Sequence, residues 1–351
     1  MITLIEEERM KSAKKSFVTR NVTCSDLRML CDKQTPKSGD LVLVNVVEIG
    51  KQKKIELTNG RKSNLHVGDE LIVAYGNRYA PDQYEAEIPT HLEECDLVAT
   101  GGIASQALSW SSKVAAPTRI KPVGLLSNVD GTPVNVADYA IITNDVPVTT
   151  IPIVAVVGSS MNSGKTTTAE SLVRGLSHNG HQVGFAKVTG TGSGGDLWTM
   201  HDAGALAAVD FTDAGMATTF KTPINQIEKA AFGLVNFLAK EGCSIVVVEI
   251  ADGIFQQETA ALIETSSFTK VIGGFIYAAD GSPGAVTGTK WLSQYGNIIG
   301  LSGLLTASPL ASREAELATG YTSYSPDVLA NGEIINQWFE SNILFTSCKA
   351  Q

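Results

Sequence analysis

A stretch near the middle of the chain holds the residue types that bind polyphosphates. It reads GSSMNSGKTT over residues 158–167. Small residues let backbone N–H groups converge on phosphate oxygens, a lysine neutralises those oxygens, and a hydroxyl can coordinate Mg²⁺. Lys165 and Thr166 are the candidates for the last two tasks. The predicted nucleotide-binding residues are Gly158, Ser159, Ser160, Met161, Asn162, Ser163, Gly164, Lys165, Thr166 and Thr167.

The spacing of this stretch is unusual by one residue. Common phosphate loops leave four residues between the first glycine and the Gly-Lys pair, whereas five lie between Gly158 and Gly164. Counted from Ser159, the loop has its normal length, with serine in place of the first glycine. Gly158 is then the end of the preceding strand.

Three further charged residues stand where strands are expected to end. Glu249 closes an apolar run, where an acid is costly unless a metal or a cation accompanies it. Lys187 closes another such run, and Asp196 follows the glycine-rich residues 189–195. Asp252 and Asp280 also follow strand ends, where a turn or cap role is as plausible as a functional one.

The elements that must position these residues have an alternating pattern. Unbroken apolar runs predict buried strands at 151–158, 181–188, 244–250, 270–277 and 297–305. A helix is expected after the phosphate loop, ending at residues 179–180, and another after Thr222, its expected N-cap. Strands alternating with helices predict an α/β fold whose parallel sheet binds ligands at the carboxyl ends of its strands.

The first part of the chain has a different character. Residues 1–36 are polar and are interpreted as a lead-in. Residues 37–148 contain short β-branched runs separated by turns, which predict a smaller β-rich domain with a type I′ hairpin turn at residues 58–61. Residues 149–351 form the predicted P-loop NTPase domain, with the boundary near residues 147–151.

The phosphate loop resembles that of dethiobiotin synthetase and its relatives, in the SIMIBI branch of P-loop NTPases. Ser160 stands where the ParA/MinD-like members of this branch carry a second lysine, which disfavours a switch built on that lysine. The segments GFAKVTGTGSGGD and VVVEIADG are similar to the family's second strand region and to its VEGAGG strand end. The resemblance covers residues 152–320, although EIADG lacks the paired glycines and the family is normally a single domain.

This resemblance implies roles for particular residues. Thr166, Asp196 and Glu249 would be Mg²⁺ ligands. Lys165 would hold the γ-phosphate and Lys187 would face the substrate's developing anion, so these two lysines are the catalytic candidates. The implied cofactors are ATP and Mg²⁺, and the implied partner is a second copy of the chain in a homodimer.

The expected function is activation of a small carboxylate- or carbamate-like substrate by phosphoryl transfer from ATP. ATP is favoured over GTP because the chain has no Asn-Lys-x-Asp motif. Two alternatives remain open. One is a nucleotide-dependent accessory protein in which residues 189–195 reorder. The other is a coenzyme-A-using N-acyltransferase of the D-amino-acid type, because such two-domain proteins share the layout of this chain.

Composition narrows the possible partners. The 351-residue chain has a net charge of -9, and a nucleic-acid or anionic-membrane surface would require a basic face. Its five cysteines are scattered without metal or disulfide spacing, which fits a reducing compartment. The acidic residues Glu6, Glu7 and Glu8 do not fit a signal peptide. A cytoplasmic protein acting on a small molecule is therefore expected.

Overall fold

The computed structural model describes residues 2–141 and 151–340, and within it the chain divides into two compact units. The barrel unit comprises residues 1–143 together with Thr191–Gly195 and Phe211–Lys221. The sheet unit comprises residues 144–190, Asp196–Asp210 and 222–351. Two segments that lie late in the sequence therefore belong to the unit formed mainly by the N-terminal part.

A closed ring of five strands forms the centre of the barrel unit. The neighbours are β12, β4, β7, β11 and β10, and β10 pairs again with β12. All these pairs are antiparallel except β7 with β11. The strands of the unit are β1 (Ile2–Leu4), β2 (Lys14–Lys15), β3 (Met29–Cys31), β4 (Leu41–Glu48), β5 (Lys54–Glu56), β6 (Lys62–Asn64), β7 (Glu70–Tyr75), β8 (Arg78–Tyr79), β9 (Tyr84–Glu87), β10 (Cys95–Ala99), β11 (Ile103–Trp110) and β12 (Thr118–Ser127).

Alternate residues of β4 and of β7 contribute to the core of the barrel unit. Val42, Val44 and Val46 of β4 and Leu71 and Val73 of β7 all belong to one buried cluster, as expected when every second side chain of a strand points to the same side. Short helices decorate the barrel, namely α1 (Glu7–Ser12), η1 (Phe17–Thr19), η2 (Cys24–Asp26) and η3 (Val136–Tyr139).

Two features of the barrel unit differ from the sequence-based expectation. Residues 1–36 are a structural part of the β-rich unit, because β1 pairs with β3, β3 with β12, and β2 with β7. These strands are two or three residues long, too short to show an alternating pattern. The hairpin between β5 and β6 exists, but only Gly60 has a positive φ (80°), so the turn is not of type I′.

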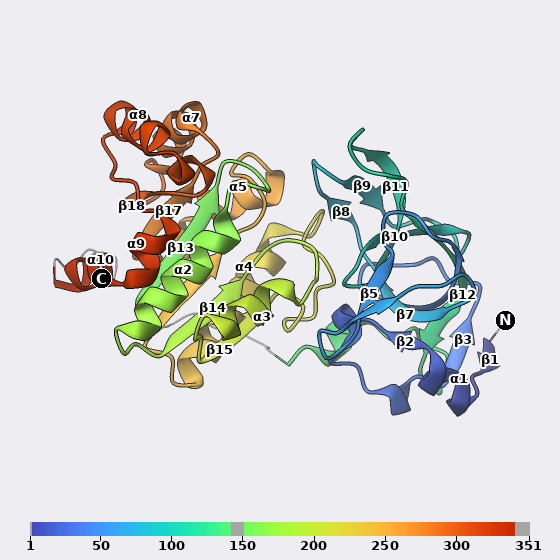
Figure 1. Ribbon diagram of the computed structural model, residues 1–351. Coiled ribbons are helices and arrows are strands. Elements are labelled where there is room, and N and C mark those ends of the chain that lie inside the picture. Colours follow the sequence, from blue (N-terminus) through green and yellow to red (C-terminus); the bar gives the residue numbers. More distant parts are fainter. Residues whose placement is uncertain (1, 142–150, 341–351) are drawn as a thin grey trace. The chain divides into compact units, whose positions relative to one another are not determined.

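The sheet unit is built on six parallel strands in the order β15-β14-β16-β13-β17-β18 (Figure 1). Their bounds are β13 (Ile153–Gly158), β14 (Val183–Lys187), β15 (Ala207–Asp210), β16 (Ile245–Glu249), β17 (Gly274–Ala278) and β18 (Ile298–Ser302). Five of the six correspond to predicted apolar runs. The sixth, β15, lies at the sheet edge and is only four residues long, so its sequence carries no comparable signal.

Helices cover both faces of this sheet. A right-handed connection between parallel strands puts its helix on a face that depends on the direction of travel across the sheet. The connections that contain α2 and α3 run toward the β15 edge, so these helices lie on one face. Those that contain α4, α5 and α7 run toward the β18 edge, so these helices lie on the other face. α2 packs beside α9 (Figure 1). The helices are α2 (Lys165–His178), α3 (Gly195–Asp202), α4 (Ile224–Lys240), α5 (Gln257–Glu264), α6 (Ser266–Thr269), α7 (Ser282–Leu292), η4 (Leu304–Ala307), α8 (Pro309–Thr319), α9 (Pro326–Asn331) and α10 (Glu333–Glu340).

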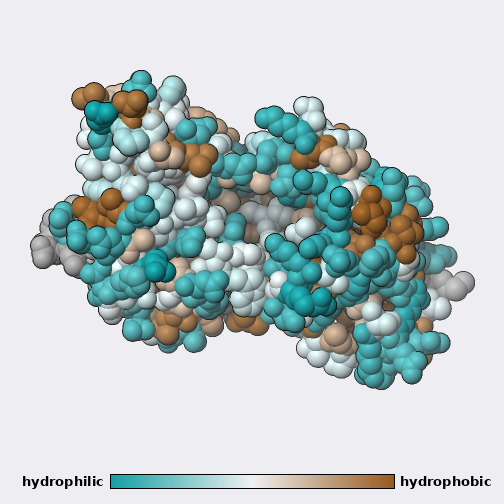
Figure 2. Space-filling model, viewed as in Figure 1, coloured by the Kyte–Doolittle hydropathy of each residue, from teal (hydrophilic) through white to brown (hydrophobic). Residues whose placement is uncertain are grey.

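The predicted α/β fold class is confirmed: a unit built on a parallel sheet follows a β-rich unit. The predicted boundary at residues 147–151 lies almost wholly outside the described residues. α4 begins at Ile224, with Pro223 rather than Thr222 as its N-cap. The visible surface is mainly hydrophilic, with apolar side chains in separate small areas (Figure 2). Within the described residues, no helix is long and apolar enough to cross a membrane.

Candidate nucleotide and metal site

The phosphate loop joins the end of β13 to the start of α2. Gly158 must be glycine, because a Cβ there would lie 2.2 Å from Oγ of Ser163 and 2.8 Å from Cγ of Lys165. Gly164 adopts a left-handed conformation with φ of 96°, and a Cβ on it would lie 2.9 Å from Cα of Gly303. Both glycines therefore allow the loop to fold tightly before the helix begins.

Lys165 is the first residue of α2 and its side chain turns back over the loop. Its Nζ donates to the carbonyl oxygens of Ser160 at 2.7 Å and of Met161 at 3.4 Å, and the residue is only 3% exposed. Burial lowers the pKa of Lys165, and the nearby carboxylates of Glu249 and Asp252 oppose that shift. Among the described residues, no carboxylate forms an ion pair with this ammonium group.

Thr166 and Glu249 meet beside the loop. Thr166 Oγ1 donates to Oε1 of Glu249 at 3.3 Å. The other carboxylate oxygen of Glu249, Oε2, is buried and has no hydrogen-bond partner among the described residues, and the same holds for the loop hydroxyl of Ser163. Unpaired buried polar atoms are costly, and two of them in one site indicate that a polar ligand belongs there.

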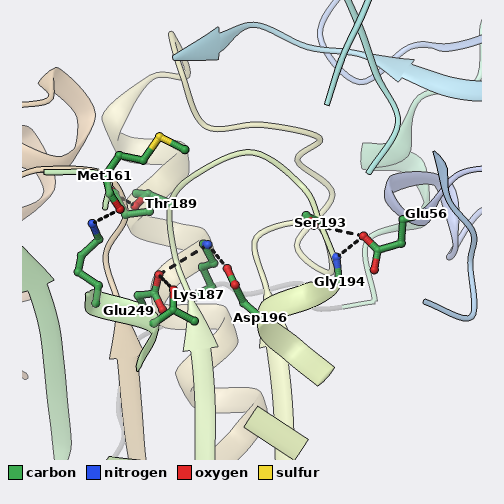
Figure 3. Close-up of polar contacts among 11 residues, drawn as sticks. Glu56, Met161, Lys187, Thr189, Ser193, Gly194, Asp196 and Glu249 are labelled. Atoms are coloured by element: carbon green, nitrogen blue, oxygen red, sulfur yellow. Dashed lines mark hydrogen bonds and ion pairs between the residues drawn. The ribbon is translucent and has the colours of Figure 1, made fainter. Parts of the chain in front are cut away.

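Lys187 lies at the carboxyl end of the sheet, in register with one acidic residue on each neighbouring strand. Its register neighbours are Glu249 on β16 and Asp210 on β15. The Nζ atom forms an ion pair with Asp196, at the start of α3, and lies 3.6 Å from Oε1 of Glu249 (Figure 3). The sheet register thus brings together Lys187 and Glu249, which are separated by about sixty residues of sequence.

Charge and burial act in opposite directions on this cluster. Burial alone would lower the pKa of Lys187, but the carboxylates of Asp196 and Glu249 raise it above its usual value, so the side chain stays cationic. Burial raises the pKa of Glu249, and Lys187 partly offsets that effect. The cluster therefore gathers two lysines and two acids in a region of low solvent access.

The residues fit a Mg²⁺ site in part. The unpartnered Oε2 of Glu249 and the Thr166 hydroxyl are oxygen donors of the kind Mg²⁺ prefers. Asp196, the third predicted ligand, is held by Lys187 instead. Within the described residues no group of three or more His, Cys, Asp or Glu side chains has a metal-binding arrangement. A metal here would need phosphate and water oxygens to complete its shell, which is usual for Mg²⁺.

Most of the glycine-rich segment before Asp196, Thr191–Gly195, belongs to the barrel unit. Within that unit, Oε2 of Glu56 accepts from the backbone N–H of Gly194 at 3.1 Å and from the hydroxyl of Ser193 at 3.2 Å (Figure 3). Glu56 is only 1% exposed. No local signal could reveal this contact, because its partners are 138 residues apart in sequence.

The remaining candidates are placed as follows. Thr167 and Asn162 are exposed on the loop and first turn. Asp280 is exposed at the end of β17 and accepts from the hydroxyl of Ser159 at 3.1 Å. Asp210, which the sequence analysis overlooked, ends β15 beside Lys187 and is 1% exposed. The short run AAVD before residue 211 was its only signal.

Comparison with known proteins shows no family for this chain. No family model matches it, and no curated protein matches it. Because no family is shown, the resemblance to dethiobiotin synthetases remains a prediction.

Several solved structures are distantly similar to part of this chain. The signal recognition particle 54 kDa protein from Aeropyrum pernix K1, in complex with GDP, is 19% identical over 61% of this chain and 53% of its own, with a TM-score of 0.37. The receptor FtsY from Elizabethkingia anophelis is 16% identical over 58% of each chain, with a TM-score of 0.34. A DUF1611 family protein from Anabaena variabilis is 13% identical over 55% of this chain and 57% of its own, with a TM-score of 0.37. The chain thus spans little more than half of these structures, and similarities this distant carry no information on activity.

Proposed function

We propose that this protein binds a Mg²⁺–nucleoside triphosphate at the phosphate loop and transfers the terminal phosphoryl group to a small-molecule acceptor. One observation carries the proposal. Lys165, Lys187 and Glu249 are gathered at the carboxyl edge of the parallel sheet, where Oε2 of Glu249 and Oγ of Ser163 are buried with no hydrogen-bond partner among the described residues. A triphosphate with its metal ion would supply partners for these two oxygen atoms and for the ammonium group of Lys165.

Each residue has a role in this reaction. The loop N–H groups and Lys165 hold the phosphates, and Thr166 with Glu249 would hold Mg²⁺, whose charge stabilises the developing negative charge. Lys187 faces an anionic oxygen of the acceptor. The bond between the γ-phosphorus and the oxygen that bridges the β- and γ-phosphates breaks, and a bond from the acceptor oxygen to the γ-phosphorus forms. The nucleoside diphosphate leaves with the electron pair of the broken bond. A carboxylate or carbamate is the acceptor implied by the resemblance, with ATP as the donor.

The identity of the loop's ligand is tested by stabilisation of the full chain. A ligand that binds only the folded protein at about 100 times its Kd stabilises it by about 2.7 kcal/mol. We expect Mg²⁺-ATP to raise the thermal midpoint, and Mg²⁺-GTP and acetyl-CoA serve as competing arms. If neither triphosphate has any effect, the proposal fails; if only acetyl-CoA acts, the acyltransferase alternative replaces it.

The role of Lys165 is tested by substitution. Lys165→Ala should abolish nucleotide stabilisation and turnover, because it removes the ammonium group at the phosphate loop. Lys240→Ala, which changes an exposed lysine at the end of α4, is the matched control and should behave as the wild type. Full turnover by Lys165→Ala would contradict this assignment.

A further inference from the structure

A pocket of about 590 Å³ opens beside the first residue of the phosphate loop. It lies wholly within the sheet unit, between the segment after β16 and the start of α7. Its lining residues are Ser159, Phe255, Tyr277, Asp280, Gly281, Pro283, Gly284 and Thr287. The other end of the loop faces a different element, because the N–H of Leu304 donates to the carbonyl of Ser163 at 3.0 Å. Of the phosphate-loop residues, Ser159 is the one that lines the described part of this pocket.

One wall of the pocket is the ring of Phe255, which packs against a neighbouring aromatic ring but stays largely exposed to solvent. Phe255 is 64% exposed although it is large and apolar. Its ring packs edge-on against Trp291 of α7 with centroids 6.1 Å apart, and Trp291 in turn packs against Tyr295 at 4.8 Å. A supported aromatic face beside a pocket is suited to contact with the apolar body of a small molecule.

The charged side chain in the described lining of the pocket is negative. Asp280 is the one charged residue among those that line it, and no lysine, arginine or histidine contributes to its described lining. Its carboxylate accepts from Ser159, and the hydroxyl of the buried Tyr277 donates to the carbonyl of Gly284 at 3.3 Å. An anion would meet an uncompensated carboxylate here, whereas an ammonium group would find a partner.

Small residues keep this carboxylate accessible. Gly284 lies in the first turn of α7, and a Cβ on it would lie 2.8 Å from Oδ1 of Asp280 and 3.5 Å from Cβ of Ser159. A methyl group at this position would thus occupy the space between the acid and the loop. Since alanine favours a helix more than glycine does, Gly284→Ala would narrow the pocket beside Asp280 while supporting the helix.

We propose that this pocket binds an amine-bearing part of the phosphoryl acceptor, with the ammonium group on Asp280 and the apolar body on Phe255. The identification of this ligand as the phosphoryl acceptor rests on the proposed function. It adds that the acceptor carries a positive group, in contrast to the anionic oxygen that faces Lys187. A nucleobase or a purely anionic molecule as the occupant would contradict the proposal.

The test uses three probes of similar shape with the full-length protein: phenethylamine, 2-phenylethanol and 3-phenylpropanoate. Ligand-observed NMR titrations give their Kd values with and without saturating Mg²⁺-ADP. We expect phenethylamine to bind at least about tenfold more tightly than 3-phenylpropanoate, with 2-phenylethanol between them. Equal or tighter binding of the carboxylate, or absence of phenethylamine binding, would overturn the proposal.

Variants locate the site of binding. Asp280→Asn should remove the tenfold preference for the amine, Phe255→Ala should weaken the amine and the alcohol alike, and Gly284→Ala should block all three probes. Asp202→Asn, which changes an exposed acid on α3, is the matched control. Circular dichroism checks that each variant is folded, and an unchanged preference in Asp280→Asn would refute the assignment.

Nucleotide binding distinguishes this proposal from the one on which it rests. If Phe255→Ala weakens Mg²⁺-ATP binding about tenfold or more, the pocket holds the nucleobase and the acceptor assignment is wrong. If the wild-type chain binds no nucleotide, the proposed function fails, while the amine preference measured without nucleotide still decides the chemistry of the pocket.

Discussion

Lys187 contacts two carboxylates, and burial distinguishes what each can do. The Glu249 side chain is 2% exposed and has one oxygen without a hydrogen-bond partner in the described part of the chain, whereas the Asp196 side chain is 27% exposed and pairs with Lys187. The side chain with the unused oxygen is the better placed for a metal ion. Glu249 should therefore contribute more to Mg²⁺ binding than Asp196 does.

This difference can be measured by isosteric substitution. Glu249→Gln keeps a hydrogen-bond acceptor for Thr166 but loses the negative charge, so we expect Mg²⁺ to stop increasing the thermal stabilisation by ATP. Asp196→Asn should lose less, and the exposed Asp202→Asn should lose nothing. A titration of the thermal midpoint against Mg²⁺ gives the order, and a larger loss in Asp196→Asn would contradict it.

Residues of the site differ in how visible they are in the sequence. The loop from Gly158 to Thr167 is recognisable because all its parts are local. Glu249 is recognisable because an acid at the end of an apolar strand is expensive. Glu56 and Asp210 carry no such mark, since one acts across 138 residues and the other ends a strand of four residues.

At the scale of elements, the start of α2 is determined by glycine conformation. Gly164 and Gly180 lie just before and just after this helix and both have positive φ, at 96° and 83°. They differ in their surroundings: a Cβ on Gly164 would touch Gly303, whereas a Cβ on Gly180 would meet nothing within 4 Å. Alanine substitution at these two glycines therefore separates the free-energy cost of a positive φ from the cost of a steric contact.

We therefore expect unequal effects from two alanine substitutions. Gly180→Ala should lower the free energy of unfolding by about 1–2 kcal/mol, the cost of a left-handed conformation for an L-residue. Gly164→Ala should cost more and should also impair nucleotide binding, because the loop must move away from Gly303. Urea unfolding and nucleotide titration measure both effects. Equal losses of stability would show that the contact with Gly303 is unimportant.

Long apolar runs made most of the parallel sheet predictable, and the same reasoning failed for short strands. β13, β14, β16 and β18 each lie within a predicted run, and β17 extends one residue beyond its own. Strands such as β1, β2 and β15 depend on pairing partners far away in sequence, so local composition does not reveal them. The ring of strands in the barrel unit was also beyond prediction, because closure is decided by which distant strands pair.

At the scale of the whole molecule, the barrel unit depends on a buried ion pair with a late segment of chain. Arg20 pairs with Asp213 and its guanidinium lies 4.1 Å from the ring centroid of Phe17. The two charged side chains are 15% and 6% exposed. Removing one partner of such a pair leaves the other charge buried, which typically costs about 3–5 kcal/mol.

We expect Arg20→Ala to lower the stability of the barrel unit by several kcal/mol. Arg28→Ala is the matched control, since Arg28 pairs with the exposed Glu7 at 3.5 Å and should be worth about 0–1 kcal/mol. Hydrogen exchange of the β4 and β7 amides reports the barrel unit specifically, which matters because two units need not unfold together. Similar protection in both variants would show that the Asp213 contact does not hold the unit together.

The two late segments of the barrel unit have a consequence for how the chain is made. An N-terminal domain commonly folds while the rest of the protein is still being synthesised. The partners of Glu56 and Arg20, however, lie at residues 193–194 and 212–213, beyond β13, α2 and β14. The barrel unit therefore cannot complete the contacts of Glu56 and Arg20 until residues 193–213 have been synthesised as well.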